Sequence, residues 1–272
     1  MYEFLLVAGT LVFAAACRTF GHPAIRKLGA LSVVAASFLT GYFLGGYSIL
    51  WGCVAAAAWF FLPWLDLLTR IRGLRLPLDK KLRRRSPPSL DTFPHLRFFT
   101  QDVTGEGFEH VTDSGWEWED MQQFVRFFYD EESKSQATIN LNQQRHVAFA
   151  YLSVSSRTAD GKIWTTWNYP FSYPMKLTPQ VQVNRVRDAG SFAELVEMHQ
   201  SFLASRGIAE AELEPADPAE LGELMERELR NQVDHNLDRG LIRLSGNGTF
   251  RYSWRGLLFL WVQAVKDMIR LS

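Results

Sequence analysis

The chain has 272 residues, of which 47% are hydrophobic, and its 29 Lys and Arg residues balance 29 Asp and Glu residues. This composition excludes a disordered or collagen-like polymer and leaves enough apolar surface for a core. The balance conceals an asymmetry, because residues 1–85 hold 11 basic and 3 acidic side chains whereas residues 86–272 hold 18 and 26. We therefore expect two regions with different surroundings.

The longest uncharged stretch, Leu28–Leu65, has 38 residues. A bilayer core about 30 Å thick takes about 20 helical residues, so this stretch is long enough for two crossings. The pair Gly45-Gly46 predicts a turn in its middle, with spans at 28–44 and 47–65. The stretch therefore predicts an integral membrane protein.

A shorter apolar segment at residues 4–16 opens the chain. We predict a third transmembrane helix there, although the segment is short for a crossing. A cleaved signal peptide is the alternative, but it begins with basic residues, and residues 1–3 include none.

Basic residues predict the orientation of these spans, because cytoplasmic loops retain Lys and Arg. Three of them lie between the first two spans, and eight follow the third span: Arg70, Arg72, Arg75, Lys80, Lys81, Arg83, Arg84 and Arg85. Three spans place both groups on one side, which predicts an outside N-terminus and a large cytoplasmic domain. The eight residues also predict contact with anionic lipid headgroups, each charge contributing about 1 kcal/mol near the surface.

Small residues in the uncharged stretch are spaced four apart, at Gly41 and Gly45 and at Gly52 and Ala56. This spacing lets helix backbones approach closely and predicts that the spans pack on each other or on another protein. The alternative is that glycine and alanine are simply common in membrane helices. Cys17 and Cys53 have no plausible partners, so we predict neither a disulfide nor a thiolate metal site.

The chain divides into a transmembrane region at 1–69, a polybasic linker at 70–89 and a soluble domain at 90–272. Within the soluble domain, strands are expected at 96–103, 137–141, 146–155, 163–169 and 181–186. The pair Asp160-Gly161 predicts a hairpin. A capping box at Ser114 and Glu117 predicts a helix that continues to Phe128.

The second half of this domain favours helices. Ser191 predicts the start of a helix over 192–203, and Asp217 with Pro218 predicts another that ends at Gly240. Two strands follow at 241–244 and 249–254. The last segment, 257–271, is short for a crossing, so it either lies in the membrane interface or closes the soluble core. Antiparallel strands followed by C-terminal helices indicate an α+β fold.

No motif for catalysis, nucleotide binding or metal binding survives inspection. The six histidines lack the four-residue spacing that places two imidazoles on one helix face, so we predict no metal and no cofactor, and the catalytic residues are unknown. Glutamates along the expected 217–240 helix would repel a phosphate backbone, so we predict no nucleic-acid partner.

Aromatic residues cluster near the prolines at 170 and 174, and five of them are candidates for contact with a partner: Trp164, Trp167, Tyr169, Phe171 and Tyr173. The sequence thus predicts a membrane-anchored, non-catalytic protein that docks on another membrane or cytoplasmic protein, or on itself, as an accessory subunit of a larger membrane complex. The alternative is a membrane-bound enzyme with a site around His146 or His199.

Overall fold

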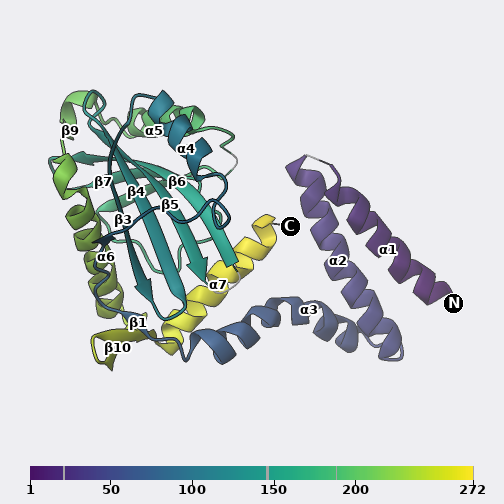
Figure 1. The fold of residues 1–272 in the computed structure, drawn as a ribbon. Coiled ribbons are helices and arrows are strands. Elements are labelled where there is room, and N and C mark those ends of the chain that lie inside the picture. The colour runs from purple at the N-terminus through teal and green to yellow at the C-terminus, as the bar shows by residue number, and fades with distance from the viewer. Residues whose placement is uncertain (21, 145–146, 188, 272) are drawn as a thin grey trace. The chain divides into compact units, whose positions relative to one another are not determined.

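The computed structural model describes residues 1–20, 22–144, 147–187 and 189–271. These residues form two compact units (Figure 1). The first comprises Met1–Leu74, Gly240–Arg243 and Arg251–Ser272, and the second comprises Arg75–Arg239 and Leu244–Phe250. The fold is α+β, with N-terminal helices followed by a mixed-sheet domain and C-terminal helices, which confirms the predicted class.

The first unit is helical. Its elements are α1 (Tyr2–Arg18), α2 (Pro23–Leu44), α3 (Ile49–Asp66), the π-helical turn Leu67–Ile71 and α7 (Trp254–Leu271). Two stretches of the described residues, Ala24–Leu44 and Ile49–Ile71, are long and apolar enough to cross a membrane. They coincide with the two halves of the uncharged stretch, whereas α1 has 17 residues and falls short of that length.

Glycines lie where α2 and α3 approach each other most closely. A Cβ on Gly45 would come within 2.5 Å of the Cβ of Trp51, and a Cβ on Gly52 would come within 2.7 Å of the Phe38 ring. A Cβ on Gly41 would overlap the carbonyl oxygen of Trp51. Any larger residue at these positions would therefore push the two helices apart.

The C-terminal helix α7 packs against α3 within the first unit. The indole nitrogen of Trp261 donates a hydrogen bond of 2.6 Å to the carbonyl oxygen of Phe60, and its ring stacks on Trp64 at a centroid distance of 6.0 Å. The guanidinium of Arg72 lies 4.7 Å from the centre of the Trp254 ring. The contacts of α7 thus join it to the helical unit, although the sequence assigned it to the domain at 90–272.

The second unit is built on a large mixed sheet of order β2-β3-β4-β5-β6-β7-β8. Neighbouring strands are antiparallel except for β7 and β8, which are parallel. The strands are β2 (Arg83–Arg84), β3 (Glu109–Trp118), β4 (Met121–Asp130), β5 (Ser135–Gln144), β6 (Val147–Thr158), β7 (Ile163–Trp167) and β8 (Val181–Arg185). The short strand β9 (Leu213–Glu214) pairs with β6. A second sheet has the order β1-β11-β10, with β1 at Leu76–Pro77, β10 at Ile242–Gly246 and β11 at Thr249–Tyr252.

Two sequence predictions in this unit are wrong. Residues 96–103 form not a strand but the start of helix α4 (Leu96–Gly105), because Leu96 and Val103 are buried seven residues apart on one helix face. The helix predicted from Ser114 to Phe128 is instead the hairpin of β3 and β4. Its turn, Glu119-Asp120, lies between the paired residues Trp118 and Met121, and Glu119 adopts a φ of 51° there.

Helices cover both faces of the large sheet (Figure 1). The face toward α4 and α5 (Phe192–Ser205), here called the apolar face, consists of Phe124, Phe128, Ala137, Ile139, Leu141, Leu152 and Val154. The face toward α6 (Leu221–Asp238), here called the polar face, carries Gln136, Thr138, Asn140, Ser153, Ser155 and Thr165. Strand alternation produces this division, because successive side chains point to opposite faces.

Both predicted helix starts are confirmed. The Ser191 hydroxyl accepts a hydrogen bond of 3.2 Å from the backbone N–H of Glu194 at the start of α5. The Asp217 carboxylate accepts one of 2.8 Å from the N–H of Ala219, in the single turn Pro218–Glu220 that leads into α6. These caps satisfy N–H groups that lack partners within the helix.

Candidate functional site

The polar face is joined by hydrogen bonds that cross from strand to strand. The Asn140 amide donates to the Thr138 hydroxyl at 2.6 Å, and that hydroxyl lies 2.6 Å from the hydroxyl of Ser153. The hydroxyls of Ser155 and Thr165 are 2.8 Å apart. These buried groups satisfy one another, which removes most of the cost of burying them.

Helix α6 closes the polar face with two side-chain amides. Asn236 accepts from the N–H of Lys176 at 2.9 Å and donates to its carbonyl oxygen at 2.9 Å. Gln232 accepts from the N–H of Thr178 at 3.3 Å and also donates to the carbonyl of Lys176. The two amides therefore bind the backbone of the 176–178 segment as a neighbouring strand would, and fix that segment to the helix.

A cavity of about 130 Å³ lies between the polar face and α6. Its walls include the rings of Tyr151, Trp167 and Tyr173 together with Glu228 of α6. Burial raises the pKa of Glu228 and outweighs its ion pair with Arg157, and burial raises the pKa of Tyr173 to about 12. The cavity therefore favours neutral groups.

His199, a candidate from the sequence, lies on α5 at the apolar face and is 2% exposed. Its Nε2 is 2.9 Å from the hydroxyl of Ser156, and its Nδ1 is 3.0 Å from the hydroxyl of Thr166. The Ser156 hydroxyl is also 2.7 Å from that of Ser135, which donates to the carbonyl of Ser133. Ser156 therefore donates to Ser135 and accepts from Nε2–H, which leaves Nδ1 to accept from Thr166.

This arrangement satisfies a neutral imidazole completely. Burial lowers the pKa of His199 to about 4, so the ring is neutral at physiological pH. A cavity of about 400 Å³ borders the ring and has Asp130, Glu132 and Glu210 among its lining residues, but both ring nitrogens face hydroxyls. The geometry is that of a structural histidine, since an active base needs a pKa nearer to the working pH.

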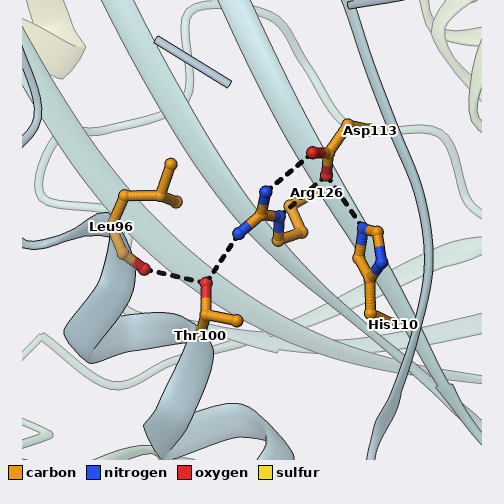
Figure 2. A network of polar contacts seen from close by, with 5 residues as sticks. All are labelled: Leu96, Thr100, His110, Asp113 and Arg126. Carbon is orange, nitrogen blue, oxygen red and sulfur yellow. Dashed lines mark hydrogen bonds and ion pairs between the residues drawn. The ribbon is translucent and has the colours of Figure 1, made fainter. Parts of the chain in front are cut away.

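A second polar group on this side of the sheet is a partly buried ion pair (Figure 2). The Arg126 guanidinium donates to both carboxylate oxygens of Asp113, at 2.8 and 2.7 Å, and to the hydroxyl of Thr100 at 2.9 Å. Thr100 in turn donates to the carbonyl of Leu96, and His110 lies 3.0 Å from Asp113. Desolvation opposes ionisation of Asp113, but the bonds from Arg126 and His110 outweigh it and lower the pKa. These hydrogen bonds join Thr100 of α4 to Asp113 of β3 and Arg126 of β4.

Aromatic residues form a connected cluster beside the start of β6 and the end of β7. Its six members, here called the aromatic cluster, are Phe149, Tyr151, Trp167, Tyr169, Phe171 and Tyr173, with neighbouring ring centroids 5.0 to 6.5 Å apart. Phe171 is 40% exposed. Trp164 does not belong to this surface, because it is 6% exposed and packs on Phe202 of α5.

Basic residues predicted to contact lipid line a groove of about 610 Å³ beside β2 and β3. Lys80, Lys81, Arg83, Arg84 and Arg85 all contribute to it. Arg85 pairs with Glu117 at 3.3 Å, whereas Lys81, Arg83 and Arg84 form no ion pair with any residue that the structure describes. Lys80 lies 4.5 Å from the centre of the Trp116 ring, and burial lowers its pKa to about 8. The groove therefore holds uncompensated positive charge. Arg70, Arg72 and Arg75 lie outside its lining.

The remaining candidates from the sequence are His146, possible metal ligands and the two cysteines. His146 lies outside the described residues. Within the described parts of the chain, no group of three or more His, Cys, Asp or Glu side chains could hold a metal ion. Cys17 and Cys53 are free.

Sequence reasoning missed the two polar arrangements that are best defined. Arg126 and Asp113 were not singled out, because the predicted helix placed neither of them on a sheet. Gln136 was missed because a single glutamine in a strand gives no signal, although the alternation of Gln136, Thr138 and Asn140 marks one face as polar. Comparisons with protein-family models, with curated proteins and with solved structures give no match.

Proposed function

We propose that this is a membrane-anchored protein without catalytic activity, whose sheet domain docks on a partner protein at the cytoplasmic face of the bilayer. In this proposal three helices cross the membrane and the N-terminus lies outside. The partner is another membrane or cytoplasmic protein, or a second copy of the chain, within a larger membrane complex.

The aromatic cluster is the observation that carries the docking proposal. Six rings in mutual contact gather at one end of the sheet, and none of the six is fully buried. Val147, at the start of β6, is 60% exposed. Aromatic residues are enriched at the centres of protein interfaces, where they bury a large area with few rotatable bonds. A partner that covers Phe171 and its neighbours would remove this surface from water.

The basic groove supports placement at an anionic membrane surface. Lys80 follows the second candidate span closely in the chain. The groove beside it carries the charges of Lys81, Arg83 and Arg84, which form no ion pair with the described residues. Phosphate groups of anionic lipids would neutralise these charges, and each contact near the surface contributes about 1 kcal/mol. The same charges favour a cytoplasmic location under the positive-inside rule.

The alternative of an enzyme around His199 lacks a supporting observation. Both ring nitrogens of His199 bond to hydroxyls and none bonds to a carboxylate, and Ser156 beside it is 1% exposed. A nucleophile at Ser156 would have no access to a substrate. In this proposal the function therefore lies at the aromatic cluster, whose member Phe171 is exposed.

Site-specific photo-crosslinking tests the docking proposal. A benzophenone amino acid replaces Phe171 in the full chain, and cells are irradiated intact. We expect one discrete crosslinked product whose protein partner is identified by mass spectrometry. Phe98, which is 60% exposed on α4, provides the matched control position and should give no such product. Failure to crosslink at Phe171, or the same product from both positions, would contradict docking at the cluster.

Cysteine labelling tests the orientation. The chain carries Ser86→Cys in a background in which Cys17 and Cys53 are replaced, and an impermeant maleimide is added to intact cells. We expect labelling only after the membrane is permeabilised, because the proposal places Ser86 in the cytoplasm. Efficient labelling in intact cells would reverse the topology without affecting the aromatic cluster.

A further inference from the structure

The cavity beneath α6 contains polar atoms that the protein leaves unsatisfied. Gln136 lines this cavity and is only 7% exposed, yet its Oε1 accepts no hydrogen bond from any residue that the structure describes. The indole N–H of Trp167, another lining residue, is buried and also lacks a partner among the described residues. A buried donor or acceptor left without a partner destabilises a protein, so we expect a bound molecule to supply hydrogen bonds to these two atoms.

The neighbouring polar groups already have hydrogen-bond partners, which limits the functional groups that a bound molecule needs. Thr138, Asn140 and Ser153 bond to one another, and Ser155 bonds to Thr165. An occupant therefore needs one donor for Gln136 and one acceptor for Trp167. A hydroxyl group supplies both functions, and two adjacent hydroxyls supply them without competing.

Charge and shape narrow it further. The carboxyl of Glu228 in the cavity wall is paired with Arg157, so the lining offers no free ion to attract a charged molecule. The rings of Tyr151, Trp167 and Tyr173 together with Leu229 provide apolar walls against which C–H groups can pack. The volume of about 130 Å³ is that of about four waters at roughly 30 Å³ each, which matches a molecule of the size of glycerol.

We propose that the cavity between the polar face and α6 binds a small uncharged polyol, with one hydroxyl donating to Oε1 of Gln136 and another accepting from the indole N–H of Trp167. The hydrocarbon side of the polyol packs on the aromatic wall. The proposal does not rest on partner docking, although Tyr151, Trp167 and Tyr173 belong to both the cavity wall and the aromatic cluster.

Glycerol is the probe for this site. The full chain is held in perdeuterated detergent micelles, and saturation-transfer NMR follows the glycerol signal as its concentration rises. We expect a saturable signal. 1-Propanol and glycerate should displace glycerol only weakly, because 1-propanol has a single hydroxyl and glycerate carries a charge. An unsaturable signal, or equal competition by all three molecules, would show that the cavity holds only water.

Two variants and a control locate the binding. Gln136→Leu removes the acceptor and Trp167→Phe removes the N–H but keeps an aromatic ring, so each should weaken glycerol binding about tenfold or more. Gln101→Leu on the exposed surface of α4 makes the same chemical change away from the cavity and should leave binding unchanged. If Gln136→Leu fails to fold, Trp167→Phe decides the question alone. Binding that is unaffected by Trp167→Phe overturns the proposal.

Discussion

The apolar and polar faces of the large sheet are stabilised in different ways. On the apolar face, Phe128, Ile139 and Leu195 are completely buried between the strands and helices α4 and α5. Burial of each such side chain contributes about 1.5–3 kcal/mol, so this face supplies much of the driving force for folding. On the polar face, hydroxyls and amides bond to one another, and each bond contributes about 1 kcal/mol net.

Polar groups also occur on the apolar face, and their setting is different. The Arg126–Asp113 pair and the imidazole of His199 each have a small set of partners and apolar surroundings. The hydroxyls of the polar face share partners across three strands and border a cavity. We therefore expect that removal of a polar group is more destabilising on the apolar face than on the polar face. On the apolar face, few other hydrogen-bond partners are available to the group that is left behind.

Loss of the Arg126 guanidinium should have the largest effect. Arg126→Met would leave the partly buried carboxylate of Asp113 with His110 as its remaining charged partner, at a cost of about 2–3 kcal/mol in the free energy of unfolding. Hydrogen exchange of the β4 and β5 amides in the full chain in micelles measures this loss. Arg97→Met on the exposed surface of α4 is the control and should change little.

A double variant separates the charge from the packing. Arg126→Met combined with Asp113→Asn removes both charges and should recover part of the lost stability, because no partly buried carboxylate then lacks its guanidinium partner. Equal destabilisation by Arg97→Met and Arg126→Met would show that the contacts of Arg126 with Asp113 and Thr100 contribute no more to stability than an exposed arginine does.

The sequence was informative where one physical signal dominated. The absence of charge from Leu28 to Leu65 predicted the two candidate spans, and the pair Asp160-Gly161 predicted the turn of the β6–β7 hairpin, where Gly161 adopts a φ of 76°. Ser191 and Asp217 predicted the helix starts because their side chains satisfy backbone N–H groups locally. Local chemistry of this kind can be read without knowledge of the tertiary fold.

The sequence misled where both faces of a strand are buried. Strand β4 places Phe124 and Phe128 on the apolar face and Val125 and Phe127 on the opposite face, so its apolar residues follow no period of two. Steps of three and four residues within that run imitated a helix. The turn Glu119-Asp120 lacks glycine and therefore gave no hairpin signal.

The candidate sites depended on contacts distant in sequence. Strand alternation alone places Trp164 and Trp167 on opposite faces, so the predicted strand could have separated Trp164 from the other candidates for partner contact. The cavity could not, because it requires α6 to lie over β5 and to bind the segment at Lys176 through Gln232 and Asn236. No local pattern encodes that contact.

The next largest effect is expected from the protonation of His199, which should make the stability of the fold depend on pH. The folded-state pKa is about 4, below the ordinary value of 6.5, so the unfolded chain binds more protons between these values. The contribution is therefore fully present above pH 6.5 and is lost as the pH falls toward 4. We expect a loss of about 2 kcal/mol between pH 7 and pH 5.

A variant identifies the source of this pH dependence. His199→Gln places a neutral amide between Ser156 and Thr166 and removes the titrating group, so the slope of stability against pH between 7 and 5 should flatten. Hydrogen exchange of β6 at several pH values, corrected for the intrinsic exchange rate, measures the slope. A slope that persists in the variant would assign the pH dependence to another group.

The smallest effect is expected on the polar face. Ser153→Ala removes one partner of Thr138, whose hydroxyl retains the bond from Asn140, so the loss should be about 1 kcal/mol or less. Adding Thr138→Val removes the Thr138–Ser153 bond from both sides but deprives Asn140 of its acceptor. The double variant should therefore lose more stability than Ser153→Ala alone and less than Arg126→Met. Hydrogen exchange of the β5 amides, measured under the same conditions for each of the three variants, gives the three losses of stability. If Ser153→Ala were as destabilising as Arg126→Met, the hydroxyls would act as one rigid network, and the contrast between the two faces would fail.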